Sequence, residues 1–142
     1  MNPVTEDIKD LLVAEGYTFT GTDDWAIFID TEPNKPDKCI TLFDTGGPDP
    51  LGCMDRSKKK LLRPSFQARV RGNSYKGAHD AMEDINVILD QHVPWTATSE
   101  DSAEADVRYQ GMQMSGDPIP LGQDDNDRFV WVTSFQTHRN ET

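Results

Sequence analysis

Residues 63–89 read RPSFQARVRGNSYKGAHDAMEDINVIL, and they place a strand, a tight turn and an amphipathic helix in immediate succession. From Phe66 to Val70 apolar residues alternate with polar ones, which is the period of a strand with one buried face and one solvent-facing face. The polar face of this strand carries Gln67, Arg69 and Arg71. Gly72-Asn73 then predicts the turn that ends the strand.

The second half of this stretch predicts a helix that begins after Ser74, whose hydroxyl can cap the first turn. Apolar residues recur at the helical period, at Ala78, Ala81, Met82, Ile85, Ile88 and Leu89. A helix with such a stripe packs on a sheet. The opposite face carries His79, Glu83, Asn86 and Asp90. We expect that face to meet water or a partner.

Outward from this centre, the sequence predicts further elements on both sides. Thr5 is a candidate cap for a first helix whose apolar stripe is Ile8, Leu11 and Leu12, and Gly16 ends it. Short apolar runs at 17–20, 25–29 and 39–43 predict strands, and two further strands, 107–114 and 128–137, flank a loop. This order predicts an α+β fold, a mainly antiparallel sheet flanked by two helices.

The 142 residues are expected to form a single domain, 1–142, because a fold of this length can bury about two-thirds of its unfolded surface. Two segments lack any apolar period. Residues 44–63 contain three glycines and two prolines and predict a long loop. Residues 138–142 are expected to be a short flexible tail.

The charge of the chain is large, negative and unevenly distributed. A net charge of −11 argues against a general nucleic-acid binder, which needs Lys and Arg to neutralise phosphates. Seven of the 14 basic residues nevertheless lie between positions 56 and 71, with no acidic residue among them: Arg56, Lys58, Lys59, Lys60, Arg63, Arg69 and Arg71. Acidic runs lie elsewhere, at Glu100, Asp101 and Glu104 and at Asp124, Asp125 and Asp127.

Two interpretations of this segregation are open. The basic segment is either a solvated loop or a docking surface for phosphate or an acidic protein surface. Complementary basic and acidic patches can join copies of one chain head to tail, and such contacts close into rings. We therefore name these basic and acidic residues as candidate interface residues.

Several function classes have no support in the sequence. Cys39 and Cys53 are 14 positions apart and imply neither a zinc site nor a disulfide framework. The N-terminus has no signal-peptide pattern and no apolar run reaches 18 residues, so we expect a chain made in the cytosol with no membrane contact. We find no catalytic motif and predict neither a cofactor nor an enzyme.

Two groups of polar residues resemble metal sites superficially. His79 and Glu83 are four apart on one helix face, but zinc sites need three or four ligands and no others can be named. The run at 124–127 lacks the glycine and the closing glutamate of a calcium loop. We interpret both as solvated polar surface and predict no metal. A small cytosolic hydrolase or ligand-binding module remains a different class, which a cleft holding a carboxylate with a strongly shifted pKa would indicate.

Residues 70–89, VRGNSYKGAHDAMEDINVIL, and 114–139, MSGDPIPLGQDDNDRFVWVTSFQTHR, resemble the small minor capsid and tail terminator (tail completion) proteins of long-tailed bacteriophages. In that family a strand ends in an arginine-glycine turn before a helix, and a late GxPxxLGxD loop precedes the last strand. The residues that carry the resemblance are Arg71, Gly72, Tyr75, Ala78, Ile85, Leu89, Gly116, Pro118, Leu121, Gly122 and Asp124.

This resemblance implies a tail-terminator-like fold assembled as a homo-oligomeric ring of six copies. It further implies a virion protein made in the host cytoplasm and located at the head-tail junction, with the tail tube protein and the head-tail connector protein as partners. DNA would pass through an acidic lumen without specific binding, because like charges repel. The 44–63 loop would be an arm reaching a neighbour or the tube. Another connector or minor capsid component is the near alternative.

Overall fold

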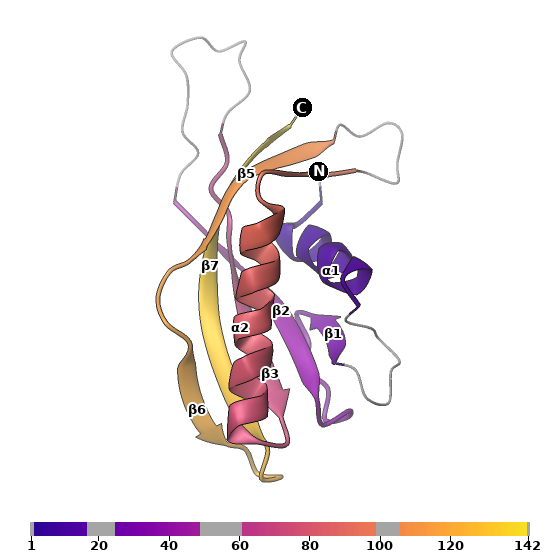
Figure 1. Ribbon diagram of the computed structural model, residues 1–142, viewed down its shortest axis with the longest axis vertical. Helices are drawn as coiled ribbons and strands as arrows, with labels where there is room; N and C mark the ends of the chain where they lie inside the picture. The colour runs from indigo at the N-terminus through magenta and orange to yellow at the C-terminus, as the bar shows by residue number, and fades with distance from the viewer. Residues whose placement is uncertain (1, 17–24, 49–60, 99–105, 142) are drawn as a thin grey trace.

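The computed structural model describes residues 2–16, 25–48, 61–98 and 106–141. Within them, helices α1 (Val4–Ala14) and α2 (Tyr75–His92) pack their apolar residues into one core with a seven-stranded curved sheet (Figure 1). The strands are β1 (Ala26–Ile29), β2 (Cys39–Gly46), β3 (Ser65–Gly72), β4 (Trp95–Ala97), β5 (Val107–Met114), β6 (Ile119–Gln123) and β7 (Phe129–Glu141). Neither helix of the described residues has the length and apolar character needed to cross a membrane.

The sheet is organised around β7, its longest strand. The strand order is β1-β2-β3-β7-β5-β4, and β6 also pairs with β7, so that one edge of β7 faces β3 and the other faces β6 and then β5. Only β1 and β2 are parallel. A single register row crosses five strands: Ile27, Ile40, Val70, Trp131 and Pro120. At this level, β1 and β6 are therefore the two edges of the sheet.

The predicted strand and helix at 63–89 are confirmed as β3 and α2. The Ser74 hydroxyl accepts a hydrogen bond from the Gly77 amide at 3.0 Å, which caps α2 as expected. α2 lies lengthwise over β3 and β7 (Figure 1). Its predicted apolar stripe is buried, with Ala78, Met82 and Ile85 each at 0% exposure. The α+β class with a mainly antiparallel sheet is thus confirmed.

The cap predicted for the first helix is wrong. α1 begins at Val4, Pro3 occupies the N-cap position, and no side chain caps the helix. Thr5 instead lies fully buried inside the first turn, where its hydroxyl donates a 2.7 Å hydrogen bond to Asp44 Oδ2 on β2. The Thr5 hydroxyl, which the local pattern assigned to capping, instead binds a tertiary partner on the sheet, Asp44.

Three sequence predictions about loops need correction. The loop between the last two predicted strands contains β6, which its Pro and Gly residues concealed; a bulge at Leu121, followed by Gly122 at φ +84°, lets it pair with β7. The segment between α2 and the acidic run at 100–104, where no strand was predicted, contains β4, paired with β5. The tail at 138–142 was expected to be flexible, but residues 138–141 continue β7, because they pair with β5.

The long loop at 44–63 is shorter than predicted at both ends. β2 continues through Gly46, and Leu62 forms a bridge with Arg139 through hydrogen bonds of 2.8 and 2.9 Å. Residues 49–60, which include Cys53, lie outside the described residues, as does the strand expected at 17–20. Cys39 is a free, buried thiol on β2, and burial raises its pKa.

Candidate assembly surfaces

The structure divides the predicted basic segment into parts with different surroundings. Arg56, Lys58, Lys59 and Lys60 lie outside the described residues. Arg63 is half-buried where the chain returns from that segment, beside Gly47 and Pro64. Arg69 and Arg71 lie on β3, on the face of the sheet opposite the helices, because they alternate with the core residues Ala68 and Val70.

Arg71 does not face solvent as the alternation of β3 predicted. It is 3% exposed, and its guanidinium donates to Glu32 Oε1 at 3.0 Å and to the carbonyls of Pro36 and Asp37 at 2.7 and 3.2 Å. Arg69 forms an ion pair of 2.7 Å with Oε2 of the same Glu32. The two arginines thus hold the segment between β1 and β2 against the far face of the sheet, and Glu32 neutralises part of their charge.

Of the predicted acidic residues, Glu100, Asp101 and Glu104 lie outside the described residues, and Asp124 is engaged within its own hairpin. Asp124 Oδ1 accepts 3.0 Å hydrogen bonds from the amides of Asn126 and Arg128, and Oδ2 accepts one of 2.8 Å from Arg128 Nε. Burial alone would raise the pKa of Asp124, but these hydrogen bonds hold it below its usual value. Asp125 is exposed, and Asp127 adopts φ +59° in the turn.

A buried polar cluster that the sequence did not reveal connects α1 to the sheet. Tyr109 on β5 donates a 2.6 Å hydrogen bond to Asp7 Oδ2, and Arg139 on β7 donates to the Tyr109 hydroxyl at 3.0 Å. Burial raises the pKa of Asp7 against the lowering effects of Tyr109 and Arg139, and burial also raises that of Tyr109. These residues belong to three distant segments, so no local pattern could have shown that they meet.

The carboxylates Asp7 and Asp10 also line a cavity of about 290 Å³ between α1 and β4. This cavity comes nearest to the enzyme-like cleft that the different class would require. Oδ2 of Asp7 already accepts a hydrogen bond from the Tyr109 hydroxyl, and the raised pKa of Asp7 has burial as its main cause. The hydrogen bond and the raised pKa of Asp7 are therefore both explained by its place in the buried structural cluster.

A larger cavity, about 530 Å³, lies between α2 and the segment that connects β5 to β6. We call it the α2–β6 groove. Its lining consists of His79, Glu83, Asn86, Val87, Met114, Asp117 and Pro118. Beside it, His79 packs on Trp131 with ring centroids 4.7 Å apart, and Tyr75 packs on the same indole at 5.0 Å. Ile119 and Leu121 of β6 are 59% and 53% exposed.

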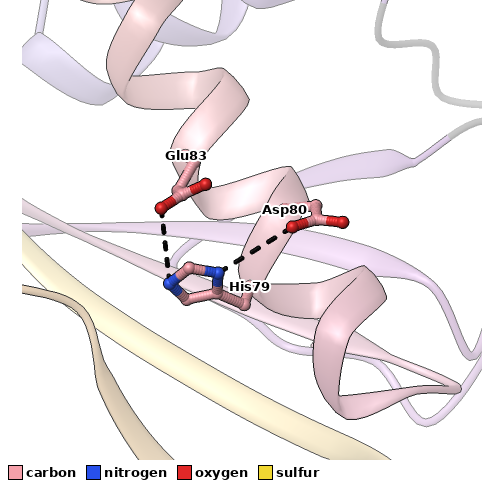
Figure 2. Close-up of side chains that lie close together, drawn as sticks. All are labelled: His79, Asp80 and Glu83. Carbon is pink, nitrogen blue, oxygen red and sulfur yellow. Dashed lines mark ion pairs between the residues drawn. The ribbon is translucent and has the colours of Figure 1, made fainter.

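His79 and Glu83, the pair that the sequence analysis weighed as a metal site and interpreted as polar surface, form one group with Asp80 (Figure 2). His79 Nδ1 lies 3.9 Å from Asp80 Oδ1, and Nε2 lies 3.6 Å from Glu83 Oε1 on the next turn of the helix. Figure 2 shows the two carboxylates on opposite sides of the imidazole. The i, i+4 spacing of His79 and Glu83 is that of ordinary helix-surface pairs, and our interpretation as polar surface stays a prediction.

These features define a class of protein: a small α+β chain with two unlike sheet edges, an exposed groove and no motif for catalysis. The sequence matches the family described as bacteriophage tail terminator protein over residues 6–141. The chain therefore belongs to that family. It is a structural protein of the phage tail and not an enzyme.

One solved structure supports the fold. A chain from the virion of a native gene transfer agent particle superposes with a TM-score of 0.62 at 16% identity, covering 97% of this chain and 95% of the other. A second solved chain has a TM-score of 0.48 at 16% identity, with coverages of 94% and 95%. No curated protein gives a significant sequence match.

Proposed function

We propose that this chain is the subunit of a six-membered ring that caps the tail tube and joins it to the head connector. The observation that carries the proposal is the family match, which spans all but a few residues at the two ends. A terminator acts by assembly and not by chemistry. This agrees with a chain whose charged groups are placed for contacts and internal ion pairs.

The edges of the sheet support a head-to-tail arrangement. At the level of the Ile27-to-Pro120 row, one edge is β1 and the other is β6. The two edges are unlike, since β1 is half-buried or buried throughout, whereas every residue of β6 is exposed. Contacts between two different surfaces on opposite sides of a subunit are heterologous, and they generate closed rings when the rotation permits.

The net charge of −11 supports a role around a DNA path. A ring built from acidic subunits presents negative potential to the genome, so DNA passes through the lumen without specific binding. The partners in this proposal are further copies of the chain, the tail tube protein and the head-tail connector protein. The near alternative, another connector or minor capsid component, uses the same fold at a neighbouring position of the virion.

The experiment is negative-stain electron microscopy of the purified chain, alone and mixed with tail tubes, with mass determination in parallel. Six-membered rings, or capping of tube ends, support the proposal. Chains that neither form rings nor cap tubes but bind the connector would replace it with the alternative.

The candidate interface residues are tested in the same assay. Replacing Lys58, Lys59 and Lys60 with Glu should abolish assembly if the basic segment is an arm. The matched control is the triple reversal of Lys35, Lys38 and Lys76, three exposed lysines that change the net charge equally. Equal effects of the two variants would mean that net charge, and not the segment, controls assembly.

A further inference from the structure

The α2–β6 groove combines apolar surface with carboxylates that remain available to a partner. Val87 in its wall is 50% exposed, and Met114 and Pro118 face it from the other side. Glu83 and Asp117 line the same space; the Glu83 side chain is 60% exposed, and Asp117 is exposed as well. A segment that carries cations together with apolar side chains would match both properties of the groove.

The chain itself contains one such segment, residues 51–61, LGCMDRSKKKL. It carries Arg56, Lys58, Lys59 and Lys60 between the apolar residues Met54 and Leu61. We propose that this basic segment of one copy docks in the α2–β6 groove of the next copy. The proposal rests on the proposed ring and deepens it, because it names the two surfaces that would meet in each head-to-tail contact.

Internal ion pairs engage three of the competing candidates within the described residues, namely Arg69, Arg71 and Asp124. Arg69 and Arg71 of the basic stretch already share Glu32. Among the acidic candidates, both oxygens of Asp124 accept hydrogen bonds from its own turn, and Arg128 neutralises it at 2.8 Å. An incoming lysine would gain less from this carboxylate, which a guanidinium already neutralises, than from Glu83, whose ion-pair partner is the His79 imidazole at 3.6 Å, or from Asp117 in the groove lining.

The geometry at the root of the segment points to a neighbouring copy. A Cβ added to Gly47 would lie 2.1 Å from the Arg63 carbonyl oxygen, so the backbone that leaves the sheet at Gly47 and the backbone that returns at Arg63 lie in close contact. We call this contact the root of the basic segment. Residues 49–60 can reach about 20 Å from this point, out and back. The root lies beside Arg139, whereas the groove extends from Met114, which pairs with Phe135, to His79, which packs on Trp131. It therefore begins about 13 Å and ends about 26 Å from the root along β7. Reaching its own groove would require the segment to double back along the sheet.

The test uses two charge-reversed variants of the full chain. The segment variant carries Lys58→Glu, Lys59→Glu and Lys60→Glu, and the groove variant carries Glu83→Lys and Asp117→Lys. Each variant alone should self-associate at least about tenfold more weakly than the wild type, because like charges then oppose each other at every contact. The control variant carries Asp84→Lys and Asp90→Lys, two exposed residues of α2 outside the groove lining, and should associate normally.

Mixing the two weak variants distinguishes contacts between copies from contacts within one copy. In an alternating ring, the acidic segment of one variant meets the basic groove of the other, and the remaining contacts keep their wild-type charges. Assembly should therefore return in the equimolar mixture, with both variants in each ring by mass. A mixture that stays dissociated, or a groove variant that assembles like the wild type, would overturn the proposal.

A binding measurement that does not depend on ring formation completes the test. A synthetic peptide of residues 51–61 is titrated into the segment variant, and NMR signals of α2 and β6 are followed. Shifts at Glu83, Val87 and Asp117 that the groove variant lacks support the proposal, and absence of binding overturns it. Peptide binding without any ring, alone or on tube ends, would contradict the proposed function while leaving the groove contact in place.

Discussion

Tyr109 and Asp7, 102 positions apart in the sequence, are joined by a 2.6 Å hydrogen bond inside the protein. The Tyr109 hydroxyl also accepts a hydrogen bond of 3.0 Å from Arg139, whose Nη1 donates in addition to the Asn2 carbonyl at 2.9 Å. The cluster therefore connects both ends of the chain with β5. It fixes α1 on the helix-covered face of the sheet more specifically than the apolar contacts around it could.

Removing the Tyr109 hydroxyl should destabilise the protein without altering its fold. In a Tyr109→Phe variant, Asp7 and Arg139 lose a buried partner while the ring still fills its place, so we expect a loss of about 1–3 kcal/mol in the free energy of unfolding. Urea denaturation followed by circular dichroism measures it. The control is Tyr75→Phe, at a ring that is 53% exposed. Equal stability of the two variants would contradict a structural role for the cluster.

The raised pKa of Asp7 gives a pH dependence with a definite sign. Burial favours the protonated carboxyl in the folded state, so the contribution of Asp7 to stability is complete below its unfolded pKa, about 3.9, and is lost as pH rises through the folded value. Relative to an Asp7→Asn variant, the wild type should therefore become less stable across that interval. Urea titrations of both proteins at a series of pH values measure the difference. A difference that stays constant or moves in favour of the wild type would show that the folded pKa is not raised.

The central strand and helix could be predicted because each has its own hydrophobic period, and because Gly72-Asn73 and Ser74 mark locally where the strand ends and the helix begins. Periodicity failed where pairing with a distant strand decides the structure. β6 contains two exposed apolar residues, a proline and a positive-φ glycine, so nothing local indicates a strand. Its structure comes from β7, to which it is hydrogen-bonded. The ordered end of β7 has the same cause.

The candidate interface residues show the corresponding limit for charge. Clustering in the sequence located the basic residues along the chain, but it could not reveal that Glu32 would pair with both Arg69 and Arg71. Composition likewise gave no reason to separate Asp124, engaged in its own turn, from Glu83 at the groove. Only the three-dimensional arrangement distinguishes charges used within the subunit from charges left for a partner.

Arg71 should behave as a structural residue and not as a surface charge. An Arg71→Met variant leaves the Pro36 and Asp37 carbonyls without their donor, although Glu32 keeps Arg69. We expect a loss of about 3 kcal/mol, the lower end of the range for breaking a buried ion pair.

Chemical denaturation of this variant should be compared with Arg108→Met, at an exposed position of β5 where the change should stay within about 0.5 kcal/mol. If Arg71→Met unfolded like the wild type yet failed to form rings, Arg71 would be an interface residue after all.

Gly47 is the position where a single methyl group should disturb both stability and assembly. Its φ is +146°, and an added Cβ would meet the Arg63 carbonyl oxygen at 2.1 Å, so a Gly47→Ala variant must separate the two chain segments at the root of the basic segment. We expect a loss of about 1–3 kcal/mol in the free energy of unfolding. Gly116→Ala is the control, because its added Cβ would meet no atom within 4 Å.

The Gly47→Ala variant also distinguishes two possible roles of the contact between Gly47 and Arg63. If the close contact between Gly47 and Arg63 only closes the end of the sheet, Gly47→Ala lowers stability. Ring formation then falls only in proportion to the unfolded fraction. If this contact also directs the basic segment toward a neighbour, ring formation should fall further than the unfolded fraction explains, because in Gly47→Ala the segment leaves the sheet at a different angle. Mass measurement of the rings, made where both glycine variants are fully folded, decides between these roles.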